Sequence, residues 1–158
     1  MEVEISLASK NTSRSTFRQV ECLFKQLYEG MNQQGLQSNL HTNGSEIWTR
    51  QLKKTLGRFQ ALVIAEELGN VIGFGVGAIR LAPEYMEIKK VGFITHINIF
   101  QEKRRNGIGR KIVNELEAWF SENQVDSIEL EVMVNNKSGE HFWEKLGYQK
   151  HLIRMQKK

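Results

Sequence analysis

The sequence predicts a single α+β domain over residues 1–158, built on a largely antiparallel β-sheet with helices on both faces. A chain of 158 residues with 40% hydrophobic side chains suits one domain with a sizeable core. The periodic segments run in the order strand, two helices, three strands, helix, strand, helix, strand, which is typical of a mixed sheet. One strand–helix–strand connection in this order predicts a single parallel strand pair.

The first half of the chain alternates clear segments with polar loops. Residues 3–7 alternate as a strand does, and apolar residues spaced by three and four predict a helix over 17–31. After a polar loop at 32–44, Ser45 is expected to cap a second helix that Gly57 ends. Strands are expected at 61–65 and 71–80, joined by a turn at 68–70. Within the second strand, Gly73, Gly75 and Gly77 predict a bulge or unusually close packing.

The second half begins with an exposed loop at 81–90, which holds the only proline. A strand over 91–100 precedes a glycine-bearing loop, and a helix over 108–120 follows it. Residues 126–134 alternate as a strand, 136–146 predict another helix ended by Gly147, and Tyr148–Met155 is expected to form a closing strand.

Composition narrows the class of protein. The net charge of +4 and the pI near 9.2 permit contact with nucleic acid without arguing for it. The single cysteine, Cys22, excludes an internal disulfide and a cysteine-built metal site, and its apolar neighbours favour a core position. No run approaches the roughly 20 apolar residues of a membrane span, and the N-terminus lacks the pattern of a secretory signal. We therefore expect a cytoplasmic protein without metal, membrane or nucleic-acid partners.

The loop over residues 101–110 carries the strongest chemical signal. Gly107 and Gly109 allow the backbone to approach a ligand closely. The first amides of the following helix lack intrahelical partners and carry partial positive charge, so a phosphate suits them. The alternative is a basic, solvated turn. A dinucleotide fingerprint would need a third glycine where Ile112 stands, and a Walker-type loop would need Gly-Lys-Ser/Thr.

Two motifs carry a resemblance to a known family. The pattern Arg-x-x-Gly-x-Gly, at Arg104, Gly107 and Gly109, resembles the pyrophosphate loop of the GNAT superfamily of N-acetyltransferases. A later stretch, residues 135–148, resembles that family's pattern Asn-x-x-Ala-x-x-Phe-Tyr-Glu-Lys-x-Gly-Phe. The matching residues there are Asn136, Phe142, Glu144, Lys145 and Gly147, while Gly139 and Tyr148 replace the usual alanine and phenylalanine.

The resemblance implies a GNAT-type twisted sheet whose parallel strands splay at their C-terminal ends. It implies acetyl-CoA as cosubstrate, with the pantetheine arm in the split and an amine of a small molecule or peptide as acceptor. Asn136 would either cap its helix or contact the pantetheine arm. The resemblance leaves a homodimer open, since dimers are common on this fold. The other implied cofactor-binding residues are Ile97, Asn98, Ile99, Arg104, Arg105, Asn106, Gly107, Ile108, Gly109 and Arg110.

The catalytic residues implied by the resemblance depart from the family pattern. Thr95 stands where many relatives have a glutamate base, and it could orient a water. His96 titrates near neutrality, but strand alternation should point it away from Thr95 unless a bulge intervenes. Trp143 stands where a tyrosine usually assists the leaving thiolate, and an indole supplies no proton at useful pH.

These departures leave open a catalytically weak acyl-CoA-binding module. A third alternative is a small basic nucleic-acid binder that uses residues 103–110, but no helix-turn-helix or RNA-binding signature supports it. The acceptor site is expected between the first two helices and the 81–90 loop. Candidates for lining it are His41, Trp48, Arg50 and Tyr85.

Overall fold

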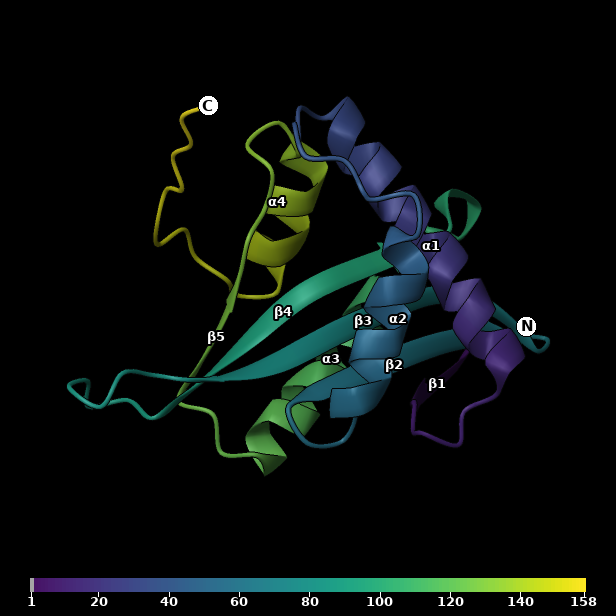
Figure 1. Ribbon diagram of the computed structural model, residues 1–158, viewed down its shortest axis with the longest axis horizontal. Coiled ribbons are helices and arrows are strands. Elements are labelled where there is room, and N and C mark those ends of the chain that lie inside the picture. Colours follow the sequence, from purple (N-terminus) through teal and green to yellow (C-terminus); the bar gives the residue numbers. More distant parts are fainter. Residues whose placement is uncertain (1) are drawn as a thin grey trace.

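The computed structural model describes residues 2–158 and confirms the predicted fold class (Figure 1). Five strands form one sheet in the order β1-β2-β3-β4-β5, antiparallel throughout except for the parallel pair β4–β5. The elements are β1 (Glu4–Leu7), α1 (Arg14–Gln33), α2 (Gly44–Thr55), β2 (Gln60–Glu67), β3 (Asn70–Leu81), β4 (Lys90–Ile99), the 3₁₀ helix η1 (Gln101–Lys103), α3 (Ile108–Glu122), β5 (Ser127–Leu130) and α4 (Lys137–Lys145).

The sheet separates two hydrophobic cores, because helices cover both of its faces. Helices α1 and α2 pack on one face through Phe17, Leu23, Phe24 and Leu52. Helix α3 packs on the opposite face, and Trp143 of α4 joins the core there. Figure 1 shows α1 and α2 in front of the strands and α3 behind them. The predicted arrangement of helices on both faces is therefore confirmed.

A stripe of glycines lets α3 lie unusually close to the sheet. A Cβ added at Gly75 would stand 2.5 Å from Cγ2 of Ile112, which is closer than real Cβ contacts come. A Cβ at Gly77 or Gly92 would stand 2.8 Å from the ring of Phe120. The β3 glycines predicted either a bulge or unusually close packing, and the structure shows both. The register of β3 against β4 shifts between Val76 and Gly77.

Two predictions about single residues are wrong. Ser45 does not cap α2, because the helix begins at Gly44 with Asn43 as its N-cap, and Ser45 is buried inside the first turn. The backbone carbonyl of Ser45 accepts a hydrogen bond from Thr49 Oγ1 at 2.9 Å within this helix. Cys22 is exposed rather than in the core, since α1 turns its apolar face through Val20, Leu23 and Phe24 instead.

The predicted closing strand is also wrong. Residues 148–155 form no strand, and β5 ends at Leu130 rather than at residue 134. Within residues 2–158, no backbone hydrogen bond involves residues 149–158. Side-chain contacts hold this segment instead: the Tyr148 hydroxyl donates to Glu117 at 2.8 Å, and Arg154 pairs with Glu131. An alternating sequence favours a strand, but a strand forms only where the edge of another strand is close enough to pair with its backbone.

Candidate active site

The parallel strands separate beyond the middle of β4, as the resemblance implies. Pairing of β4 with β5 runs only from Val91–Ser127 to Ile94–Leu130, whereas β4 continues to Ile99. The Phe100 amide donates to the Ile72 carbonyl on β3. This bond shows that the main-chain amide of Phe100 faces β3. Because main-chain groups alternate sides along a strand, those of Ile97 and Ile99 face the opposite side, which β5 leaves open. The two residues thus offer backbone groups to a ligand lying in the split.

The loop after β4 presents a row of unpaired amides. Arg105 and Gly107 adopt left-handed backbone conformations with φ of 65° and 76°, and α3 begins directly afterwards at Ile108. In the described chain, no acceptor pairs with the backbone amides of residues 105–110, and no side chain caps the helix. The first helical bond is donated by Lys111 to Gly107 at 3.2 Å. Unpaired amides at a helix N-terminus, together with the helix dipole, favour an anion over a neutral ligand at this position.

Two of the predicted cofactor-binding side chains hold the end of β4 together. Arg104 Nε donates to the Ile99 carbonyl at 3.0 Å, and its Nη2 donates to Asn98 Oδ1 at 3.2 Å. Asn98 is buried and donates in turn to the Leu23 carbonyl of α1 at 2.9 Å. The Ile99 carbonyl, on the open side of β4, is therefore covered by the Arg104 guanidinium.

Of the remaining basic residues of the loop, Lys103 forms an ion pair, whereas Arg105 and Arg110 form none among the residues described. Lys103 forms an ion pair with Glu67 at the end of β2, which ties the loop to the sheet. Asn106 donates to the Lys103 carbonyl at 3.3 Å and tightens the same turn. Arg105 and Arg110 are exposed and make no ion pair among the residues described. They are the cations available to an incoming anion.

Ile108 and Gly109 are buried, so neither offers a side chain to a ligand. Ile108 belongs to the core beneath α3. A Cβ at Gly109 would stand 3.1 Å from the ring of Phe142 on α4. Gly109 is thus needed for the packing of α3 against α4, in addition to any contact with phosphate.

A β-bulge brings Thr95 and His96 together. Val76 pairs with His96 and the next residue of β3, Gly77, pairs with Ile94, so Thr95 is the extra residue. His96 Nδ1 lies 2.8 Å from Thr95 Oγ1, which donates to the Val76 carbonyl at 3.4 Å. Nδ1 is therefore the donor of the imidazole ring, and its Nε2 is left as an acceptor.

His96 stands in an aromatic enclosure formed by α1 and α2. Its ring centroid is 5.2 Å from that of Phe24 and 5.5 Å from that of Trp48. The Tyr28 hydroxyl lies 3.4 Å from Nε2. Burial lowers the pKa of His96 to about 4, so the imidazole is neutral near pH 7. Sequence reasoning missed Tyr28, since its spacing in α1 shows only that it shares a helix face with Phe24.

Trp143 lies apart from this pair and packs in the core. It is 8% exposed and contacts Phe142 and Tyr148 edge-on, with centroids 4.9 and 5.2 Å away. Tyr148 does not replace the missing tyrosine, because its hydroxyl donates to Glu117. Burial, reinforced by this hydrogen bond, raises the pKa of Tyr148 well above its usual range.

Asn136 caps helix α4, one of the two roles left open for it. Its Oδ1 accepts the Gly139 amide at 3.0 Å. A Cβ at Gly139 would stand 2.4 Å from the Asn136 side chain, so the glycine leaves room for this capping rotamer of Asn136.

The candidate acceptor-binding residues are scattered rather than clustered. Trp48 lies beside His96, as described above. His41 and Arg50 are exposed, and Tyr85 is 87% exposed at the tip of the β3–β4 connection. Over residues 2–158 there is no group of three His, Cys, Asp or Glu side chains that could hold a metal ion. The described helices include none long and apolar enough to cross a membrane.

A family model described as "Acetyltransferase (GNAT) family" matches residues 24–148. The chain belongs to the GNAT family of acetyltransferases. The match spans both motifs, so it includes the glycine loop and the start of α4. No curated protein sequence gives a significant match to this GNAT chain.

Several solved structures share the fold of this GNAT domain. The aminoglycoside N-acetyltransferase AAC(6')-Iy in complex with CoA aligns over 99% of this chain and 95% of its own, with TM-score 0.78 and 17% identity. A tetramutant of the BH1408 protein from Bacillus halodurans aligns over 98% and 99%, with TM-score 0.80 and 22% identity. A ribosomal-protein-alanine N-acetyltransferase from Brucella melitensis biovar Abortus 2308 aligns over 98% and 100%, with TM-score 0.69 and 16% identity.

Proposed function

We propose that this GNAT domain transfers the acetyl group of acetyl-CoA to a primary amine by direct attack. The observation that carries the proposal is the junction of two features at the end of β4. The backbone groups of Ile97 and Ile99 face an open split, and the unpaired amides of residues 105–110 follow a few residues later. An extended thioester arm with a pyrophosphate at its far end matches both features.

Binding begins at the loop. The amides at the start of α3, with Arg105 and Arg110, take the pyrophosphate through hydrogen bonds and charge. Ile97 and Ile99 pair with the amide groups of the pantetheine arm as a neighbouring strand would. The arm needs the Ile99 carbonyl, so the Arg104 guanidinium must leave it and is then free to turn toward the phosphates.

In the transfer step, the amine nitrogen forms a bond to the thioester carbonyl carbon and the carbon–sulfur bond breaks. The sulfur leaves with the bonding electron pair, and the amine loses one proton. A backbone amide near Ile97 stabilises the developing oxyanion, an effect worth roughly 10²–10³ in rate. Holding both reactants in the split supplies much of the remaining acceleration.

His96 is a weak base here. An imidazole with a pKa of about 4 accepts a proton poorly, and Nε2 already faces the Tyr28 hydroxyl. The acceptor amine therefore reaches the site already deprotonated, or it gives its proton to water oriented by Thr95. Trp143 acts by packing rather than by proton transfer.

The second candidate is an acyl-CoA-binding module with little turnover, favoured by Thr95 and Trp143 in place of glutamate and tyrosine. Calorimetry with acetyl-CoA, paired with an assay for CoA release, separates the two. The amine panel should include aminoglycosides and peptides with N-terminal alanine, because structural neighbours are named for such acceptors. Binding with no CoA release by any amine would favour the module.

The loop assignment has its own test. Arg110→Glu reverses an exposed charge in the first turn of α3, whereas Lys145→Glu makes the same charge change at the end of α4. We expect Arg110→Glu to weaken acetyl-CoA binding about tenfold or more, because it removes a charged contact worth roughly 1.5–3 kcal/mol. Lys145→Glu should leave affinity unchanged. Equal affinity in both folded variants would refute the loop assignment.

A further inference from the structure

Four rings from α1, α2 and β4 gather in the aromatic enclosure, which consists of Phe24, Tyr28, Trp48 and His96. The Trp48 ring stacks on Phe24 with centroids 4.0 Å apart, and the Tyr28 ring is 5.0 Å from Phe24. His96 lies 5.5 Å from Trp48 and 6.1 Å from Tyr28. Phe24 is buried, whereas Tyr28, Trp48 and His96 are all partly exposed. The enclosure therefore presents a surface made of three neighbouring rings.

This surface lies on the side of the sheet from which an acceptor can reach the thioester. His96 directly precedes Ile97, whose main-chain groups face the split. The His96 ring points to the face covered by α1 and α2, as its contacts with Phe24 and Trp48 show (Figure 1). The opposite face is filled by the core beneath α3, where the side chains of Ile97 and Ile99 pack. An amine that attacks the carbonyl near Ile97 therefore brings the rest of its molecule alongside the enclosure.

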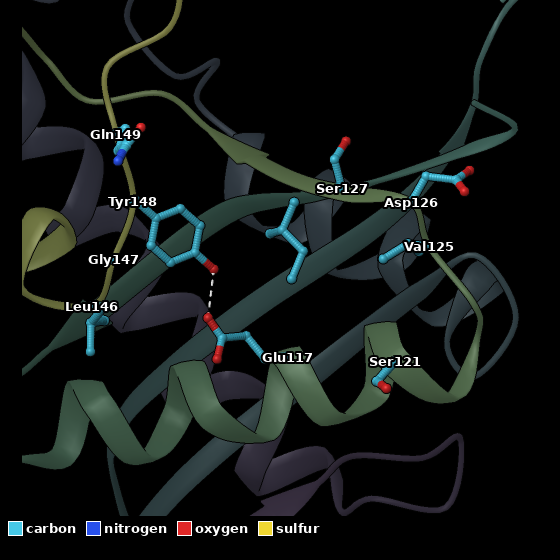
Figure 2. Close-up of a pocket in the computed structure, with 10 residues that line it drawn as sticks. Glu117, Ser121, Val125, Asp126, Ser127, Leu146, Gly147, Tyr148 and Gln149 are labelled. Atoms are coloured by element: carbon cyan, nitrogen blue, oxygen red, sulfur yellow. Dashed lines mark hydrogen bonds between the residues drawn. The ribbon is translucent and has the colours of Figure 1, made fainter. Parts of the chain in front are cut away.

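The groove between α3 and β5 lies at the other end of β4. It has a volume of ≈ 590 Å³ and is lined by residues of α3, by residues 125–128 and by residues 146–149 (Figure 2). Ser127 of this groove pairs with Val91 at the beginning of β4, whereas the split opens beyond Ile94. The Glu117 carboxylate in the groove already accepts the Tyr148 hydroxyl, the dashed line of Figure 2. The enclosure is therefore the better placed of the two sites to receive an acceptor.

The enclosure carries no charge near pH 7. Burial lowers the pKa of His96 to about 4 and raises the pKa of Tyr28, so both side chains are neutral. Their polar atoms already have partners, since the Tyr28 hydroxyl lies 3.4 Å from Nε2 of His96 and Thr95 Oγ1 lies 2.8 Å from Nδ1. A charged group placed against these rings would lose its water without meeting a counter-ion, whereas an apolar group would be stabilised by leaving water.

The charged residues beside the enclosure cancel one another. On α1 they are Lys25 and Glu29, on α2 they are Glu46 and Arg50, and all four side chains are exposed. Two basic and two acidic side chains give no net charge, and the whole chain carries a net charge of +4. A polycation such as an aminoglycoside or a polyamine is therefore not drawn to this surface, because its attraction would need an excess of carboxylates.

We propose that the acceptor is a primary amine carried by an aromatic body with no second positive charge, and that Trp48 and Tyr28 bind its ring. The inference rests on the proposed function and specifies the acceptor class of the same site. Aromatic rings prefer offset or tilted contacts with centroids about 4.5–7 Å apart, and the Tyr28 ring already makes tilted contacts at 5.0 and 6.1 Å. An acceptor ring extends this cluster while its nitrogen reaches the thioester carbonyl beside Ile97.

Turnover with matched amines tests the acceptor class. At saturating acetyl-CoA, CoA release is measured with 2-phenylethylamine, 1,4-diaminobutane and an aminoglycoside, and kcat/KM is expressed per unprotonated amine. We expect 2-phenylethylamine to exceed the other two by about tenfold or more, because burial of a phenyl ring supplies at least that much affinity. Equal or faster turnover of 1,4-diaminobutane or the aminoglycoside overturns the inference and leaves the proposed transfer standing.

Trp48→Leu tests whether the enclosure binds the ring. It removes an aromatic ring but keeps an apolar side chain, so KM for 2-phenylethylamine should rise about tenfold while affinity for acetyl-CoA stays the same. The matched control is Phe59→Leu, which removes a 44% exposed ring between α2 and β2, outside the enclosure, and should change neither quantity. Tyr28→Leu removes a second ring of the enclosure and takes the place of Trp48→Leu if that variant does not fold. An unchanged KM in the folded variant overturns the inference.

Calorimetry makes the test independent of catalysis. When 2-phenylethylamine is titrated into the chain saturated with CoA, we expect binding to the wild type and to Phe59→Leu, and about tenfold weaker binding to Trp48→Leu. If acetyl-CoA binds but no amine releases CoA, the proposed transfer is wrong, and this titration alone decides the inference. Absence of binding, or equal affinity in the wild type and Trp48→Leu, overturns it.

Discussion

The burial of His96 predicts a measurable loss of stability at mildly acidic pH. The pKa of His96 is lowered from 6.5 to about 4 by burial among the aromatic rings of α1 and α2. Below pH 6.5 the unfolded chain takes up a proton that the folded chain does not, so the free energy of unfolding falls as the pH falls. The contribution is present in full above about pH 6.5 and is lost toward pH 4. From pH 7.5 to pH 5 the two pKa values give a loss of about 2 kcal/mol.

Urea denaturation followed by tryptophan fluorescence at several pH values measures this loss. His96→Gln is the matched variant, because it removes the titrating group while keeping polar atoms near Thr95 and Tyr28. The variant starts less stable, but its unfolding free energy should vary about 2 kcal/mol less than that of the wild type over the same pH range. Parallel pH profiles for the two proteins would show that His96 titrates normally and would refute the reasoning.

Three further outcomes are expected. Leu116→Ala should cost roughly 2–5 kcal/mol in denaturant unfolding, because Leu116 is fully buried on the side of α3 that packs on the sheet; a change below about 0.5 kcal/mol would contradict this placement. Asn136→Ala should cost about 1 kcal/mol through loss of the α4 cap, while Asn136→Asp retains it; equal thermal stability of the two variants would argue against the cap. In turnover assays, kcat/KM should rise with pH toward the pKa of the acceptor amine, and His96→Ala should lose less than about tenfold. A loss of several hundredfold with unchanged acetyl-CoA affinity would make His96 the base.

The fold was largely predictable because periodicity reports which face of each segment is buried. The apolar spacing in α1 and α3 and the strand-loop-helix order around Gly107 correctly predict the helices, the parallel pair and the exposed amides. Residues 148–155 show the limit of this approach. Their alternation predicts a strand, yet whether a strand forms depends on a partner edge that sequence periodicity does not report.

The site was less predictable than the fold, because side-chain partners come from distant elements. The Thr95 bulge depends on the register between β3 and β4, which no local pattern reveals. Tyr28 meets His96 across 68 positions of sequence, and Glu67 reaches Lys103 from the far end of β2. Arg104 matches the family motif but contacts the Ile99 carbonyl, because the end of β4 offers an acceptor nearby.

The glycine stripe beneath α3 couples the packing of the sheet to the position of the 105–110 loop. Helix α3 carries the unpaired amides at its first turn, and its height above the sheet is set by Gly75, Gly77 and Gly92. A side chain at any of these positions would lift or tilt the helix and move those amides relative to Ile97 and Ile99. If the proposed function is right, a substitution in the stripe weakens acetyl-CoA binding without changing any residue of the loop. Enlarging a stripe glycine would require a smaller residue at Ile112 or Phe120 to keep the loop in place.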